Sequence, residues 1–257
     1  MQTTLEVLFA PAEFSALGRR DLSETVCVVF DVLRATSSIV TALGNGAEAV
    51  LPVDGIPEAL DVRRRKPAVL LAGERDGVRI QSALTGSIPF DLGNSPREFT
   101  REKVLGKTIV MTTTNGTRAL RACARARSIL ISSFLNLQAT AGLIEKDPPA
   151  HLLFVCSGTF EQASYEDILG AGALCDLIWA RVSRGEVADS ALIAHRLWQL
   201  EQDDVLAGIS RSRNGRRLLR NPKLREDVPF CAQRDLFSLV VRLGPDGLAR
   251  KTDRGCG

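Results

Sequence analysis

One segment constrains the fold more than any other, because an apolar run in it changes abruptly into a polar turn. Residues 26–30 are all apolar and rich in valine, which is typical of a strand buried on both faces of a parallel sheet. Asp31 and Arg34 follow directly, and Thr36 can open a helix. In open α/β sheets, ligands bind beyond the carboxyl ends of the strands. The segment therefore predicts an α/β fold with a polar site at this edge of the sheet.

The same order of strand, polar loop and helix recurs along the chain as far as residue 184. It is clearest over residues 26–43, 108–123 and 151–184. This alternation predicts a layered α/β/α architecture with a mostly parallel or mixed sheet, and it is compatible with two similar subdomains. We expect residues 1–257 to form a single unit, with any subdivision near residues 100–130 or near residue 185.

Two local signals predict element boundaries. The sequence Ser-Pro-Arg-Glu from Ser95 to Glu98 predicts a helix start, with Ser95 as the N-cap and Glu98 as its reciprocal capping partner. Near the end of the sequence, residues 237–243 predict the last strand. We expect the tail from Gly244 onward to be loosely held.

Bulk composition excludes several classes of partner. A formal net charge of +3 is close to neutral, which argues against nucleic-acid binding through the whole surface. The basic stretch at residues 211–225 lacks aromatic side chains and precedes Glu226 and Asp227, so it predicts a solvated helix face from which one arginine could reach a site. No apolar run is long enough to cross a bilayer, and no signal peptide is evident. We expect a cytoplasmic protein without a membrane partner, and an oligomer stays open.

The supply of metal-binding side chains favours oxygen ligands. The sequence has six cysteines at irregular spacing, so we expect no disulfide framework. It has only two histidines, His151 and His195, which makes a zinc site improbable. Any metal is therefore expected to be held by oxygen atoms, which favours magnesium.

Four predicted loops at strand ends carry polar side chains that a hydrophobic core does not need. Because the carboxyl ends of parallel strands share one edge, we expect these side chains to meet in one pocket. Each has a structural alternative: Asp31 could pair with Arg34 or cap a helix, and acids at a helix start are favoured by the helix dipole. The loops supply Asp31 and Arg34; Glu74 and Arg75; Thr112, Thr113, Thr114, Asn115 and Gly116; and Thr159, Glu161, Glu166 and Asp167.

The loop from Thr112 to Gly116 is the most informative of the four. Its hydroxyl and amide groups form a dense cluster of neutral hydrogen-bond donors, which suits phosphate or sulfonate oxygens. A Walker loop is absent, because the sequence lacks Gly-x-x-x-x-Gly-Lys. The structural alternative is a turn with a polar helix cap.

Taken together, these stretches resemble the 2-phosphosulfolactate phosphatase family over about residues 5–243. Two positions depart from the family pattern, because Asp76 stands where glycine is expected and Ser157 where alanine is expected. The stretches that carry the resemblance are residues 31–36, 73–75, 92–96, 112–117, 158–159, 166–167 and 170–172. The resemblance implies a magnesium-dependent phosphatase that hydrolyses 2-phosphosulfolactate to sulfolactate and phosphate, a step toward coenzyme M.

The resulting hypothesis assigns a role to each group. One Mg²⁺ would be held by carboxylates drawn from Asp31, Glu74, Glu161, Glu166 and Asp167. Asp31, Arg34, Glu74 and Arg75 would act in catalysis, with the two arginines clamping phosphate or sulfonate. The substrate would be bound by Asn94, Thr112, Thr113, Thr114, Asn115, Gly116 and Thr159.

Three alternatives are open at this stage. Attack on phosphorus by water and attack by Asp31 itself are both compatible with these residues. A phosphatase of the haloacid dehalogenase kind is disfavoured, because Leu33 occupies the position of its second aspartate. A non-catalytic module that binds a small phosphorylated or sulfonated acid would retain its ligand unchanged.

Overall fold

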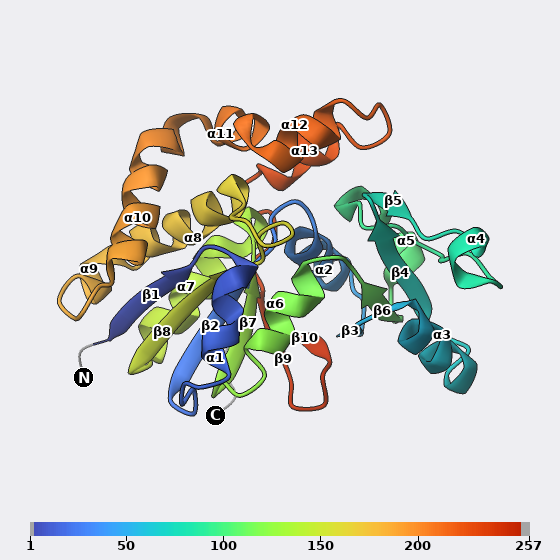
Figure 1. Ribbon diagram of the computed structural model, residues 1–257, viewed down its shortest axis with the longest axis horizontal. Coiled ribbons are helices and arrows are strands. Elements are labelled where there is room, and N and C mark those ends of the chain that lie inside the picture. Colours follow the sequence, from blue (N-terminus) through green and yellow to red (C-terminus); the bar gives the residue numbers. More distant parts are fainter. Residues whose placement is uncertain (1–2, 253–257) are drawn as a thin grey trace.

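A computed structural model describes residues 3–252 and contains one ten-stranded mixed sheet (Figure 1). The strand order is β1-β8-β2-β7-β9-β10-β3-β6-β4-β5. This architecture confirms the predicted α/β class. The strands are β1 (Thr4–Leu8), β2 (Thr25–Phe30), β3 (Ala49–Pro52), β4 (Leu70–Arg75), β5 (Val78–Arg79), β6 (Thr108–Thr112), β7 (Ser128–Ser132), β8 (His151–Cys156), β9 (Val240–Leu243) and β10 (Ala249–Thr252).

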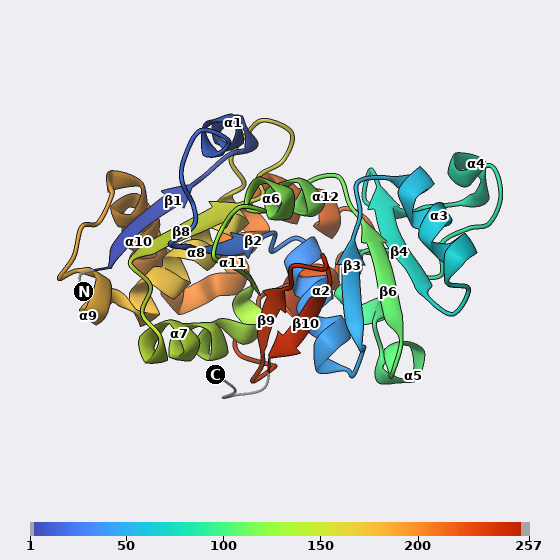
Figure 2. The ribbon, with the colours of Figure 1, turned by 90° about the horizontal axis from the view of Figure 1, so that it is seen from below.

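Two groups of parallel strands form most of the sheet. The first contains β1, β8, β2 and β7, and the second contains β3, β6 and β4. The antiparallel hairpin of β9 and β10 joins them, because β9 pairs with β7 and β10 pairs with β3. Figure 2 shows the strands of the second group running across the direction of the first. With this rotation, loops from both groups line one pocket.

The central hairpin corrects one prediction. The last predicted strand is present as β9, but the chain beyond Gly244 is not loose. It turns through Gly244-Pro-Asp-Gly247 and forms β10, where Ala249 is buried and pairs with Val50 of β3. The four-residue turn is a hairpin signal that the sequence interpretation overlooked. Residues 253–257 of the predicted tail lie outside the described residues.

Helices cover both faces of the sheet, as the layered prediction requires. Alternate side chains of β2 enter two different cores: Val28 and Phe30 face one, while Cys27 and Val29 face the other. The first core is closed by α7 (Leu137–Lys146), α8 (Tyr165–Leu177) and α10 (Asp189–Glu201). The second is closed by α2 (Ala35–Gly44) and α6 (Gly116–Ala122).

The second core also connects the two strand groups. It contains Cys27 of β2 together with Val50 of β3 and Ile109 of β6. A third, smaller core lies between α3 (Ile56–Arg65) and the second group, where Ala59 packs with its neighbours. Because side chains of both strand groups are buried together in the second core, the two groups share one hydrophobic interior.

A helical segment extends over the carboxyl ends of the strands (Figure 1). It consists of α11 (Val205–Arg211), α12 (Arg213–Leu219) and α13 (Asp227–Cys231). None of the helices within residues 3–252 is long and apolar enough to span a membrane. Short helices and 3₁₀ turns complete the connections: η1 (Pro11–Glu13), α1 (Phe14–Leu17), α4 (Ser82–Thr85), η2 (Pro96–Glu98), α5 (Arg101–Val104), η3 (Phe134–Asn136), α9 (Trp179–Val182) and η4 (Gln202–Asp204).

The predicted capping box at Ser95 is wrong. Ser95 is the N-cap of the 3₁₀ turn η2, but its side chain makes no capping bond. The Glu98 carboxylate instead accepts from the Gly93 backbone N–H at 3.0 Å, and the Ser95 hydroxyl donates to Asp227 at 2.6 Å. Tertiary partners have therefore replaced the local bonds that the sequence pattern favours.

Candidate active site

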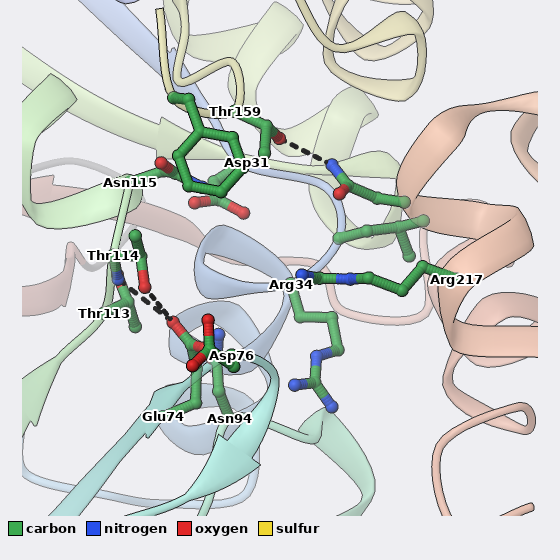
Figure 3. Close-up of a pocket in the computed structure, with 13 residues that line it drawn as sticks. Asp31, Arg34, Glu74, Asp76, Asn94, Thr113, Thr114, Asn115, Thr159 and Arg217 are labelled. Atoms are coloured by element: carbon green, nitrogen blue, oxygen red, sulfur yellow. Dashed lines mark hydrogen bonds between the residues drawn. The ribbon is translucent and has the colours of Figure 1, made fainter. Parts of the chain in front are cut away.

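A pocket lies where the carboxyl-end loops of both strand groups meet the helical segment (Figure 3). The loops after β2, β4, β6 and β8 contribute to its wall, and α12 closes one side. The sequence predicts a site at the carboxyl ends of the strands, and these ends meet here although the two groups run in opposite directions, because three antiparallel pairings separate them. The lining residues are Asp31, Leu33, Arg34, Glu74, Asp76, Asn94, Thr113, Thr114, Asn115, Thr159, Phe160, Asn214 and Arg217.

Asp31 is buried, and only one of its two carboxylate oxygens accepts a hydrogen bond from the protein. Its Oδ1 accepts the Ala35 backbone N–H at 3.0 Å, which fixes the side chain against the start of α2. Its Oδ2 has no hydrogen-bond partner among the described residues. Burial raises the pKa of Asp31 from 3.8 to about 6, the Ala35 hydrogen bond opposes this, and the charges of Glu74 and Glu166 raise it further. A free oxygen on such a carboxylate can bind a cation or act on a substrate.

Glu74 joins the two loops of the second strand group. One carboxylate oxygen accepts from both the backbone N–H and the hydroxyl of Thr114, at 3.0 and 2.9 Å. The other accepts the Gly77 backbone N–H at 2.7 Å. At Gly73 (φ +154°), a side chain would clash with the backbone of Thr112, so only glycine allows β4 and β6 to approach this closely. Glu74 is thereby held rigidly beside the loop of threonines.

The oxygen atoms in the pocket fit a magnesium ion. Asn94 Oδ1 and Thr113 Oγ are buried and have no hydrogen-bond partner within residues 3–252. Such orphaned atoms cost free energy unless a ligand engages them. Together with the carboxylates of Asp31 and Glu74, they form an all-oxygen donor set. No group of three or more His, Cys, Asp or Glu side chains able to hold a metal occurs in the described chain, but Mg²⁺ needs only one or two carboxylates.

Arg34 lines the pocket, but its charged end already has partners. One terminal nitrogen donates to the Asp227 carboxylate at 2.7 Å and the other to the Gly77 carbonyl at 2.9 Å. Both side chains of the ion pair are buried. The predicted anion clamp therefore faces a buried carboxylate in this structure.

Arg217 presents its guanidinium to the pocket instead. It extends from α12 toward the centre of the pocket in Figure 3. It is exposed, and no hydrogen bond or ion pair of its side chain occurs within the described residues. The sequence predicts one arginine from the basic stretch near the site, and the structure identifies it as Arg217.

Six predicted site residues lie outside the pocket wall. Three of them support it from behind: Arg75 donates to the Glu74 carbonyl and to Thr112 Oγ, and Gly116 packs beneath Asp31. Glu161 is exposed and pairs with Arg118 at the surface. The remaining two, Glu166 and Asp167, are buried at the start of α8.

Glu166 and Asp167 organise the loops around the pocket. Asp167 accepts the backbone N–H groups of Val32 at 2.8 Å and Gly158 at 3.1 Å, which joins the loops after β2 and β8. Burial raises its pKa well above the usual value, and the charges of Glu166 and Asp31 add to this effect. Glu166 accepts from Asn214 at 2.7 Å. Burial also raises the pKa of Glu166, while the Asn214 hydrogen bond opposes the shift.

Sequence reasoning did not single out several lining residues. Asp76 (φ +55°) and Phe160 (φ +56°) both adopt the left-handed conformation that favours glycine. Asp76 was visible only as a departure from the family pattern. Asn214 and Arg217 belong to the basic stretch, where nothing in the sequence distinguishes them from their neighbours.

Comparison with known proteins identifies the family of the chain. The profile of the 2-phosphosulpholactate phosphatase family matches residues 14–245. The chain belongs to this family. A probable 2-phosphosulfolactate phosphatase of Thermotoga petrophila is 42% identical over 216 residues, which cover 84% of this chain and 88% of the relative. One of Caldanaerobacter subterraneus subsp. tengcongensis is 38% identical over 239 residues, covering 92% and 95%.

Membership of the 2-phosphosulpholactate phosphatase family confirms the resemblance inferred from the sequence. It also makes the chain a hydrolase that acts on phosphoric monoester bonds. The matched region contains every lining residue of the pocket, from Asp31 to Arg217.

Proposed function

We propose that this phosphatase hydrolyses the phosphomonoester of a small hydroxy acid with the help of Mg²⁺. The proposed substrate is 2-phosphosulfolactate, and the products are sulfolactate and phosphate. The names of the relatives, probable 2-phosphosulfolactate phosphatases, support this substrate. We place the reaction in the cytoplasm, as a step toward coenzyme M. The observation that carries the proposal is the free Oδ2 of buried Asp31 in a pocket lined by neutral hydrogen-bonding groups.

The residues that would hold Mg²⁺ are Asp31, Glu74 and Asn94, with Thr113 beside them. When bound, the ion would neutralise charge on the phosphate oxygens. Burial raises the pKa of Asp31, and a cation bound beside it would oppose this shift and favour the ionised form. Glu166 and Asp167 do not line the pocket, although one oxygen of Glu166 has no partner within residues 3–252. Both oxygens of Asp167 accept backbone N–H groups, and Glu161 lies at the surface.

The protein's own groups account for positioning the phosphoryl group. Thr113 and Asn115 offer neutral donors from the loop after β6, and Thr159 lines the same pocket from the loop after β8. Phosphoryl transfer depends mainly on such positioning and on electrostatic stabilisation. With a pKa of about 6, Asp31 is mostly ionised at neutral pH. It can accept a proton from a water that attacks phosphorus, or attack phosphorus itself to form an aspartyl phosphate that water then hydrolyses. In both routes the P–O ester bond breaks, and the hydroxy acid leaves and takes up a proton.

Phosphate release from 2-phosphosulfolactate tests the proposal. We expect turnover with Mg²⁺ that EDTA abolishes and that Asp31→Asn lowers by at least about 10³-fold, as for loss of a central catalytic group. Glu161→Gln is the matched control, because its carboxylate pairs at the surface, and it should retain activity. Independently of turnover, Mg²⁺ should raise the Tm of the wild type more than that of Asp31→Asn. Activity that survives both EDTA and Asp31→Asn would refute the scheme.

A further inference from the structure

The arginines around the pocket differ in whether the protein already supplies hydrogen-bond acceptors for them. Arg34 is paired with the Asp227 carboxylate, and Arg75 donates to the Glu74 carbonyl and to Thr112 Oγ. Arg213 of α12 donates to Gln162 and to the Thr159 carbonyl. Arg217 lines the pocket and has no such partner within residues 3–252. A bound anion is therefore the natural partner of Arg217.

The backbone that carries Arg217 is fixed from one side by Asn214. The Asn214 amide donates to Thr159 Oγ at 2.8 Å and to Glu166 at 2.7 Å, and all three residues are buried. The Ser212 hydroxyl caps α12 by accepting the Gly215 backbone N–H at 2.9 Å. These bonds hold α12 against the loop after β8.

A second anchor follows in α13. Asp227 is fully buried, and its two oxygens accept from Arg34 and from the Ser95 hydroxyl. Arg217 lies between the two anchors in the sequence, and its guanidinium reaches the turn after β4, with Nη2 at 3.8 Å from the position a side chain on Gly77 would occupy. Its helix is therefore preorganised, which lowers the entropy lost when an anion binds.

We propose that Arg217 binds the acid group of the substrate that is not its phosphate, either a carboxylate or a sulfonate. This inference rests on the proposed function. In the proposed function the phosphate lies at the threonine loop, beside the Mg²⁺ that Asp31 would hold, whereas Arg217 approaches from the opposite wall, on α12 (Figure 3). A planar guanidinium matches the paired oxygens of a carboxylate or a sulfonate. Arg217 is thus the specificity-determining residue that selects phosphorylated acids over other phosphomonoesters.

The test compares two substrates in two variants. Arg217→Met should lower kcat/KM for 2-phosphosulfolactate by about 10- to 100-fold, the usual cost of a charge-assisted hydrogen bond. The effect on phenyl phosphate, which has no second acid group, should be at least tenfold smaller. Arg216→Met is the matched control, because Arg216 is exposed on the same helix and does not line the pocket. Equal losses for both substrates, or none for either, would overturn the assignment.

Binding of unphosphorylated acids separates this inference from the proposed function. Sulfolactate, lactate and 2-hydroxypropanesulfonate present both acid groups, the carboxylate alone or the sulfonate alone. Calorimetry should show that at least sulfolactate binds the wild type and that Arg217→Met weakens this binding about tenfold or more. The lactate and sulfonate results identify which acid group Arg217 contacts. Absent hydrolysis with Arg217-dependent binding would refute the proposed function alone, whereas binding unaffected by Arg217→Met would refute this inference alone.

Discussion

The guanidinium of Arg34 and the carboxylate of Asp227 form a buried ion pair 2.7 Å long, although 193 residues separate them in the sequence. The pair connects the loop after β2 to α13. The second oxygen of Asp227 accepts from Ser95, which adds the turn before η2 to the same cluster. The walls of the pocket are therefore joined by polar bonds that water does not reach.

Asp227→Ala should destabilise the protein strongly. Removing one partner of a buried ion pair leaves an uncompensated charge, and the typical cost is about 3–5 kcal/mol. Urea unfolding should show this loss as a lower midpoint. The exposed pair of Asp246 and Arg250 provides the control, and Asp246→Ala should change the midpoint far less. Equal effects of the two substitutions would contradict a structural role for the Arg34–Asp227 pair.

The groups at strand ends were predictable from the sequence for a definite reason. An apolar run that ends in Asp31, and a short one that leads to Glu74, mark buried strands with polar residues at their carboxyl ends. That these two ends meet is not a consequence of a parallel sheet, because three antiparallel pairings separate β2 and its neighbours from β4 and its neighbours. The same reasoning placed Asn115 and Thr159 in the pocket, where the structure has them. Periodicity and polarity along the chain are sufficient for inferences of this kind.

The sequence could not predict the roles of side chains whose partners lie far away along the chain. Whether Arg34 faces a substrate or a buried carboxylate is decided by Asp227, which lies in a different element. The choice of Arg217 from a run of arginines depends on how α12 docks. Glu161 resembles a metal ligand in the sequence, but Arg118 engages it at the surface. The residues next to each partner in the sequence give no indication of these pairings.

Gly116→Ala should damage the site more than it damages the fold. An added methyl group would lie 2.6 Å from the Ala35 side chain and 2.8 Å from Asp31 Oδ2, so Asp31 would have to move. Misplacing a catalytic group by about 1 Å can cost about 10²-fold in rate. We expect a loss of kcat of that order in the phosphate-release assay.

The control for this substitution is Gly142→Ala in α7, where no atom lies within 4 Å of the added methyl group. Alanine in a helix interior is favoured over glycine by about 0.5–1 kcal/mol, so this variant should be active and slightly more stable. A fully active Gly116→Ala variant would show that Asp31 does not need its present position.

Asp76→Gly should improve both stability and the use of anionic substrates. Asp76 has φ +55°, which glycine adopts without strain and other residues adopt at a cost of about 1 kcal/mol. Its carboxylate also lines the pocket, where it repels a substrate with several negative charges. We expect a higher Tm, and a lower KM for 2-phosphosulfolactate than in the wild type. A higher KM would instead indicate that Asp76 contacts the substrate or the metal favourably.

Asp31→Asn should stabilise the protein at neutral pH while it abolishes activity. The folded-state pKa of Asp31 is raised from 3.8 to about 6, so folding disfavours the charged form. Well below pH 3.8 the carboxyl is protonated in both states and no penalty applies. As the pH rises from about 4 to 6, the unfolded state loses its proton first, and wild-type stability falls by about 3 kcal/mol.

Above pH 6 this penalty is constant, and asparagine removes it while its Oδ1 can still accept from Ala35. Urea unfolding of the metal-free protein across pH 4–8 should therefore show a smaller decline for Asp31→Asn than for the wild type. The difference should shrink when Mg²⁺ is added to the wild type, because a bound cation offsets the buried charge. If the two proteins lose stability in parallel over this range, burial does not raise the pKa of Asp31 in the way the structure indicates.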